Sequence, residues 1–192
     1  MKDSFVRVFA LVSILSIFAF AEAEKTAVLF DFEKADELKC FQLDGPGKDA
    51  MKAELAADNK TSGKTCLKVT YPNDGWADIQ FTKFNGDWSN YNMLKMDIFN
   101  PTKNVLGIQF QGADKNAGIS KEAYFGDPDK RVSATFMLRG GKNEVMVPLK
   151  FDRPFDLKNV KMWSISTMSR PAGLILYIDN IRLEKGNLKY EE

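Results

Sequence analysis

The chain has 192 residues, of which 44% are apolar and 28% charged, so it is long enough to bury the core of one globular domain. Its formal charge of +1 gives no electrostatic reason to expect binding to nucleic acid or to an anionic membrane surface. Histidine is absent, which removes the commonest general base and the usual zinc ligand, so an enzyme is not expected.

Residues 1–23 have the pattern of a secretory signal peptide. Lys2 and Arg7 precede an apolar run that is too short for a comfortable membrane span of about 20 residues. Small residues at 19–21 and again at 21–23 form two possible cleavage sites. We therefore predict a secreted, periplasmic or cell-surface protein with no membrane span after cleavage, and an uncleaved N-terminal anchor is the alternative.

Export would make a disulfide possible. The chain has two cysteines, Cys40 and Cys66, and an even count in an oxidising compartment favours a bridge. Closing this loop would stabilise the fold by roughly 3 to 4 kcal/mol. The alternative is a pair of buried free thiols.

Abundant aromatic residues and short β-branched runs predict strands rather than helices after residue 23. Residues 35–38 are compatible with a helical turn, residues 51–57 with a short strand or a helical turn, and residues 112–130 with a polar excursion loop. Residues 24–186 are thus predicted to form one all-β domain, a two-sheet antiparallel β-sandwich, followed by a frayed tail at 187–192. The expected strands are 28–33, 66–71, 76–81, 93–99, 106–111, 132–138, 144–149, 162–168 and 173–184.

The first and last of these strands each carry an acid within an apolar run, Glu33 and Asp179, which suggests that the two ends of the domain meet. In the strand at 106–111, Leu, Ile and Phe alternate with glycine and glutamine. Gln109 and Gln111 should therefore face away from the core. That face could simply be solvated, or it could bind a ligand.

Six segments, in order and spacing, resemble the jelly-roll carbohydrate-binding modules of the galactose-binding-domain-like superfamily. The resemblance covers nearly the whole mature chain and implies a jelly roll whose partner is a glycan or polysaccharide. The matching segments are 29–33 (LFDFE), 63–71 (GKTCLKVTY), 76–81 (WADIQF), 87–101 (DWSNYNMLKMDIFNP), 140–149 (GGKNEVMVPL) and 176–183 (LYIDNIRL).

The resemblance also implies a structural Ca²⁺ between the first and last strands. Glu33 and Asp179 stand at the matching positions, backbone carbonyls at 62–64 are plausible further ligands, and Asp31 shares a strand face with Glu33 and could assist. Hard oxygen donors are what Ca²⁺ requires. The alternative is that these acids are rim residues paired with Lys or Arg.

Sugar recognition usually needs an exposed aromatic ring flanked by polar groups. Trp76 follows a turn at the start of a strand and is the best candidate for this ring, with Tyr124 in the excursion loop next. Gln109, Gln111 and Arg139 are the expected polar partners. The other two tryptophans are expected in the core, because Trp88 lies in a segment that resembles a structural corner and Trp163 alternates in phase with Ile165.

The sequence thus predicts an exported, non-catalytic glycan-binding module. No pair of carboxylates stands out as an acid and base, and no serine has a histidine to activate it. The alternative is an exported structural or assembly protein that uses the sandwich as a building block of a surface layer, filament or complex, with itself or other surface proteins as partner.

Overall fold

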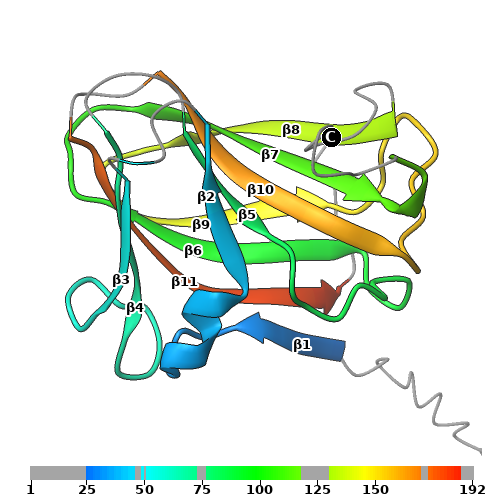
Figure 1. Cartoon of the computed structure of the whole chain (residues 1–192), viewed down its shortest axis with the longest axis horizontal. Coiled ribbons are helices and arrows are strands. Elements are labelled where there is room, and N and C mark those ends of the chain that lie inside the picture. Colours follow the sequence, from blue (N-terminus) through cyan, green and yellow to red (C-terminus); the bar gives the residue numbers. More distant parts are fainter. Residues whose placement is uncertain are drawn as a thin grey trace, which may run out of the picture.

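The chain folds as two antiparallel sheets packed face to face, as the computed structural model in Figure 1 shows. The structure describes residues 25–45, 49, 51–72, 77–117, 130–169 and 173–186. Within these ranges there are eleven strands, and the helical segments include short 3₁₀ turns at Ala35–Lys39 (η1) and Lys115–Ala117 (η3). The predicted all-β sandwich is confirmed. None of the helices in the described ranges is long and apolar enough to cross a membrane.

One sheet has six strands in the order β3-β4-β11-β6-β9, with β1 also paired to β11. The other has five, in the order β2-β5-β10-β7-β8. The six-stranded sheet comprises β1 (Lys25–Phe30), β3 (Lys52–Ala56), β4 (Cys66–Thr70), β6 (Met93–Asn100), β9 (Gly141–Pro148) and β11 (Ile175–Lys185). The five-stranded sheet comprises β2 (Phe41–Asp44), β5 (Asp78–Phe81), β7 (Leu106–Asp114), β8 (Arg131–Leu138) and β10 (Val160–Ser169).

The first and last strands do meet, as predicted. β1 runs antiparallel to the second half of β11, from the pair Lys25 and Lys185 to the pair Phe30 and Ile181. The first half of β11 pairs instead with β4, from Ile175 to Ile178. The strand therefore changes neighbour at Asp179 and Asn180, and the positive φ of 50° at Asn180 marks this irregularity.

The core lies between the sheets and is built on aromatic rings. Trp163 stacks on Phe81 with ring centroids 4.0 Å apart and planes 7° from parallel. Trp88 is fully buried, and its indole Nε1 donates to the carbonyl of Asn85 at 2.9 Å. Both tryptophans are core residues, as predicted, because their large apolar rings contribute more to stability when they are removed from water.

Three local predictions are wrong. β2 was not expected, because its four residues are too few to show a clear period. The excursion loop does not begin at residue 112, since β7 continues to Asp114, whose Oδ1 and Oδ2 accept the main-chain N–H groups of Asn116 and Asp156, each at 2.7 Å. The first strand ends at Phe30, and Phe32 has a φ of 53°, so Asp31 and Glu33 do not share a strand face.

The expected disulfide is also absent, and both cysteines are free thiols. Cys40 leads into β2 of the five-stranded sheet, whereas Cys66 begins β4 of the other. The Cys66 thiol lies 3.2 Å from the carbonyl oxygen of Asp58, and burial, assisted by the charge of Asp179, raises its pKa to about 11, so it is an inert core group.

Candidate functional site

Two rows of polar side chains cross the outer face of the five-stranded sheet, and each strand contributes one residue to each row. Side chains two apart in a strand share a face, and the pairing registers bring these positions side by side. We call the ten residues the polar face. The rows, in strand order, are Gln42, Gln80, Ser164, Gln111 and Ser133, and then Asp44, Asp78, Ser166, Gln109 and Thr135.

Accessibility of the polar face changes from one edge to the other. On β5 and β10, Gln80 and Ser164 are fully buried. On β7, Gln109 and Gln111 are half-buried, and the serine and threonine of β8 are exposed. Among the described residues, the β7–β8 half of the polar face is the larger accessible part, and Gln42, Asp44 and Ser166 are also exposed or half-buried.

The buried part of the polar face is organised by the Gln80 amide. Its Nε2 donates to Asp44 Oδ2 at 3.0 Å and to Asp78 Oδ1 at 3.3 Å, and its Oε1 accepts from Gln42 Nε2 at 3.3 Å. Ser164 Oγ lies near enough to Asp78 to lower the pKa of that carboxyl somewhat, but makes no hydrogen bond of normal geometry within the described chain. These contacts fix the side chains before any ligand arrives.

Burial raises the pKa of Asp78 to about 7, and the nearby charge of Asp44 adds to the rise. The Asp78 side chain is only 2% exposed, and no cation lies among the named contacts that could offset its desolvation. The polar face therefore contains one carboxyl that changes its charge near neutral pH.

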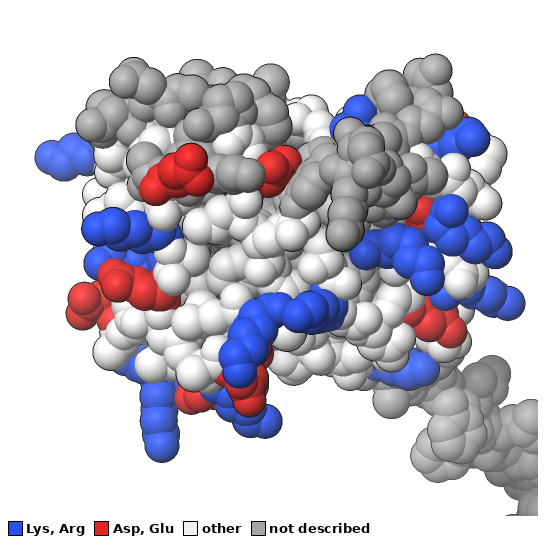
Figure 2. Space-filling model, in the orientation of Figure 1, with Lys and Arg blue, Asp and Glu red and all other residues white. Residues whose placement is uncertain are grey.

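On the accessible half, Gln111 Nε2 donates to Gln109 Oε1 at 3.1 Å, so the two amides are aligned along β7. Gln111 and Ser133 also line a cleft of about 470 Å³ that opens where β8 begins and β9 ends. We call this the basic cleft, because Arg131, Lys150 and Arg153 also line it. In Figure 2, Lys and Arg side chains gather at the right-hand end of the molecule, where these strand ends lie.

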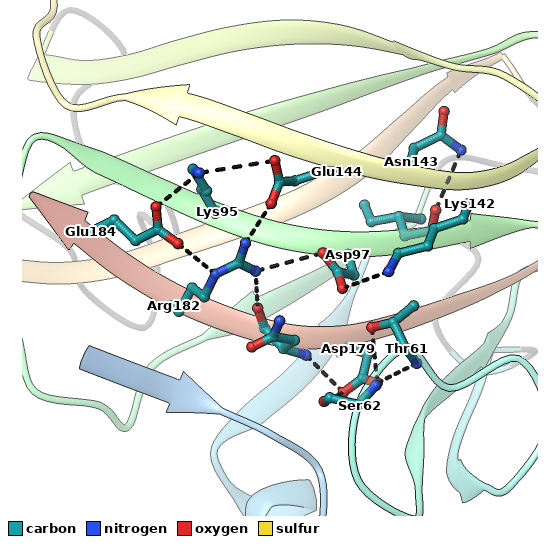
Figure 3. Close-up of polar contacts among 12 residues, drawn as sticks. Thr61, Ser62, Lys95, Asp97, Lys142, Asn143, Glu144, Asp179, Arg182 and Glu184 are labelled. Atoms are coloured by element: carbon teal, nitrogen blue, oxygen red, sulfur yellow. Dashed lines mark hydrogen bonds and ion pairs between the residues drawn. The ribbon is translucent and has the colours of Figure 1, made fainter. Parts of the chain in front are cut away.

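A second cluster of polar side chains lies where β11 changes its neighbour from β4 to β1. Asp179 is 1% exposed, and its Oδ2 accepts the main-chain N–H groups of Thr61 at 2.7 Å and Ser62 at 2.8 Å (Figure 3). Its Oδ1 accepts the N–H of Asn180 at 2.7 Å and the hydroxyl of Ser62 at 3.3 Å. Glu33 Oε1 accepts the N–H groups of Lys64 at 2.6 Å and Thr65 at 2.9 Å.

Residues 61–65, Glu33 and Asp179 together form what we call the terminal clasp. Its carboxylate oxygens face N–H and O–H donors, which a cation would have to displace. Asp31 contributes only an Oδ1 that accepts the N–H of Glu33 at 3.2 Å. The described residues contain no group of three acidic, cysteine or histidine side chains that could hold a metal. Asp179 and Glu33 Oε1 already accept hydrogen bonds from the loop at residues 61–65, and the calcium site stays a prediction.

A ladder of charged side chains covers the outer face of the six-stranded sheet beside the clasp (Figure 3). Arg182 contacts Glu184 at 2.7 Å and Asp97 at 3.5 Å, and it also pairs with Glu144. Lys95 pairs with Glu184 at 2.8 Å. Lys142 pairs with Asp97 at 3.5 Å, so three cations balance three carboxylates across β6, β9 and β11, and this face offers little net charge to a ligand.

The structure places some of the residues predicted to bind a ligand side by side and others far apart. Gln109 and Gln111 lie together and face away from the core, as predicted. Arg139 lies beyond the other end of β8, six residues from Ser133, or about 20 Å at about 3.3 Å per residue. Its main-chain N–H donates to Asn143 Oδ1 at 2.9 Å. Trp76 and Tyr124 lie outside the described residues.

Most of the polar face was not predicted. Gln42, Asp44, Asp78, Gln80 and Ser164 join Gln109 and Gln111 only through strand pairing, which a single sequence does not reveal. One signal was available, because in the run from Asp78 to Phe81 polar residues alternate with Ile79 and Phe81. The same alternation places the β7 glutamines on that face.

No protein-family model and no curated protein sequence matches the chain, but solved structures do. A family 11 carbohydrate-binding module from Clostridium thermocellum, in complex with a β-1,3-1,4-mixed-linked tetrasaccharide, has a TM-score of 0.60 at 16% identity, covering 86% of this chain and 98% of that one. A family 29 carbohydrate-binding module complexed with mannohexaose has a TM-score of 0.51 at 10% identity, covering 85% and 93%.

An exo-β-agarase has a TM-score of 0.64 at 14% identity, covering 85% of this chain but 25% of the agarase chain. These identities are low, so the likeness shows the fold alone. The chain is a jelly-roll β-sandwich of the kind found in carbohydrate-binding modules, which confirms the fold that the sequence resemblance implied.

Proposed function

We propose that this protein is an exported, non-catalytic glycan-binding module whose ligand lies across the β7–β8 half of the polar face. The observation that carries the proposal is the pair of polar rows. Aligned amides and hydroxyls from adjacent strands form a surface with alternating donors and acceptors, which suits the ring of hydroxyl groups on a sugar. The likeness to carbohydrate-binding modules supports the same function.

Binding without catalysis is favoured by the state of the acids on this face. Asp78 is the carboxyl with a raised pKa, the property expected of a general acid, but it is buried and hydrogen-bonded to Gln80. Asp44, its cross-strand neighbour, accepts from the same amide. Both carboxyls are therefore committed to contacts within the protein rather than opposed across an open cleft.

Affinity electrophoresis in gels containing mixed-linked β-glucan, mannan or agarose tests the proposal. We expect at least one of these glycans to slow the protein, and Gln111→Ala to weaken that binding about fivefold, the effect of losing one hydrogen bond of about 1 kcal/mol. Asn90→Ala is the control, since it removes an exposed amide that lies outside the polar face. Unchanged mobility in every glycan would reject the proposal.

Export is tested separately by the mass of the protein recovered outside the cytoplasm. We expect it to lack residues 1–21 or 1–23, according to which predicted cleavage site is used. Recovery of the full-length chain in the membrane fraction would instead support the uncleaved anchor.

One observation favours the assembly role as a second candidate. β8 and β9 are end strands of their sheets, and each carries an exposed methionine: Met137 is 64% exposed and Met146 47%. Together with Phe136 they line a groove of about 280 Å³. Unpaired strand edges with apolar side chains can pair with another chain. Light scattering over a range of concentrations distinguishes the candidates, because self-assembly requires the mass to rise.

A further inference from the structure

The basic cleft carries a chemistry that a neutral glycan would not use. Its described lining includes three basic side chains, Arg131, Lys150 and Arg153, and one carboxylate, Asp152. The whole chain has a formal charge of only +1, so this concentration of basic side chains is local rather than a general property of the protein. Low-dielectric walls strengthen such a field inside a cleft.

The cations come from two separate segments that the fold brings together. Arg131 is the first residue of β8, while Lys150 and Arg153 follow the end of β9. Arg153 Nη1 donates to the main-chain carbonyl of Arg131 at 3.4 Å, which holds its guanidinium beside the start of β8. Lys150 is exposed. Guanidinium groups present parallel N–H donors that match the two oxygens of a carboxylate or sulfate.

The rest of the cleft suits a sugar ring. Phe151 is half-buried and packs edge-on against Phe155, with ring centroids 5.2 Å apart, so part of its surface remains open to the cleft beside Pro148. An aromatic surface of this kind can pack against the C–H face of a sugar. Gln111 and Ser133 belong both to the cleft and to the polar face, so a chain that lies on β7 and β8 continues into it.

We infer that the ligand is an acidic glycan, and that the basic cleft binds a carboxylate or sulfate group of one of its sugar units. The inference rests on the proposed function, since it names the class of glycan that the polar face takes. The side chains of the polar rows hydrogen-bond the hydroxyl groups of the sugar, and the basic side chains of the cleft favour glycans that carry negative charge. Carboxylated and sulfated glycans share this chemistry, and separate probes distinguish them.

The test compares charged glycans with neutral forms of the same sugar chain. We expect polygalacturonate or dextran sulfate to retain the protein in affinity electrophoresis, and fully methyl-esterified polygalacturonate and dextran to retain it at least tenfold less. Binding should weaken severalfold between 50 and 300 mM salt, because ions screen the attraction.

Two cleft variants and one control test the role of the cleft itself. Lys150→Glu should weaken binding to the retained acidic glycan about tenfold. Arg153→Lys, which keeps the charge but removes the planar fork, should weaken it severalfold. Lys103→Glu is the matched control, because it reverses the charge of an exposed lysine in the turn that packs against Gly140, beyond the other end of β8. Thermal melting of each variant verifies that the fold is intact.

Equal retention by charged and neutral glycans, with Lys150→Glu unchanged, overturns the inference and leaves the proposed function standing. Equal losses for Lys150→Glu and Lys103→Glu also overturn it, since they indicate diffuse attraction. Equally tight binding to inorganic polyphosphate or single-stranded DNA shows a general anion site and overturns the assignment to glycans. Absence of binding to all glycans, neutral and acidic, rejects both proposals.

Discussion

The terminal clasp and the polar face both concentrate polar side chains on strands, but they use them differently. In the clasp, carboxylate oxygens accept main-chain N–H groups of residues 61–65, so their bonding capacity is used within the protein. On the β7–β8 half of the polar face, bonds run between side chains, as from Gln111 to Gln109, and the groups stay accessible. The contrast indicates that the clasp supplies stability and the polar face supplies recognition.

The largest expected effect on stability follows from removing Asp179, the central acid of the clasp. Asp179→Ala leaves the N–H groups of Thr61 and Ser62 without an acceptor that is both charged and close. Hydrogen bonds to charged groups contribute about 1.5 to 3 kcal/mol each, so we expect the free energy of unfolding to fall by about 3 to 6 kcal/mol. Denaturant unfolding measures this loss.

Asp179→Asn, which keeps one carbonyl oxygen, should lose about half as much, and glycan binding by either folded variant should be unchanged. Addition of a chelator to the native protein addresses the predicted Ca²⁺. If N–H donors alone satisfy the clasp, the melting midpoint does not move. A midpoint that falls with chelator and recovers with Ca²⁺ would establish the metal and reject the metal-free clasp.

The second prediction concerns the buried half of the polar face. Asp78 has a pKa of about 7 in the folded chain, against about 3.9 for an unfolded aspartate, so the folded state binds more protons between these values. Its contribution to stability is therefore complete below pH 4 and is lost as the pH rises through 7. Asp78→Asn should abolish this slope, which amounts to at most about 4 kcal/mol at about 1.4 kcal/mol per pKa unit.

Unfolding free energies of both proteins at intervals from pH 4 to 8 provide the measurement. The difference between wild type and Asp78→Asn cancels the other titrating groups. Parallel curves would show that the carboxyl titrates normally and that the buried half of the polar face is open to water.

The sequence was sufficient for features that depend on local alternation. Nine predicted strands are present, because a period of two is visible within each segment, and the same period placed Gln109 and Gln111 correctly. β2 was missed because four residues, Phe41 to Asp44, are too few to show a clear period. Pairing of β1 with β11 was also anticipated, from apolar runs that each carry an acid.

Features that depend on which strands are neighbours were not predictable in the same way. The polar rows arise because β10 lies between β5 and β7, although it follows both in the chain by more than forty residues. The disulfide prediction was wrong for the same reason, since spacing along the chain does not show where the fold places Cys40 and Cys66 relative to each other. In the clasp, Glu33 and Asp179 do converge on one loop, but the sequence does not show that N–H groups face them.

The last and smallest effect concerns how closely the Glu33 carboxylate approaches the loop at residues 61–65. Gly63 has a φ of +51°, and a Cβ at this position would lie 2.2 Å from Glu33 Oε1, which Lys64 and Thr65 hold in place. Gly63→Ala should therefore lower the free energy of unfolding by about 2 kcal/mol through backbone strain and a displaced carboxylate. Gly141→Ala has a positive φ of 90° but no atom within 4 Å of its Cβ, and Gly186→Ala has no such neighbour and no positive φ. If Gly63→Ala costs no more than Gly141→Ala, backbone conformation alone explains the glycine, and the close contact between loop and carboxylate does not contribute.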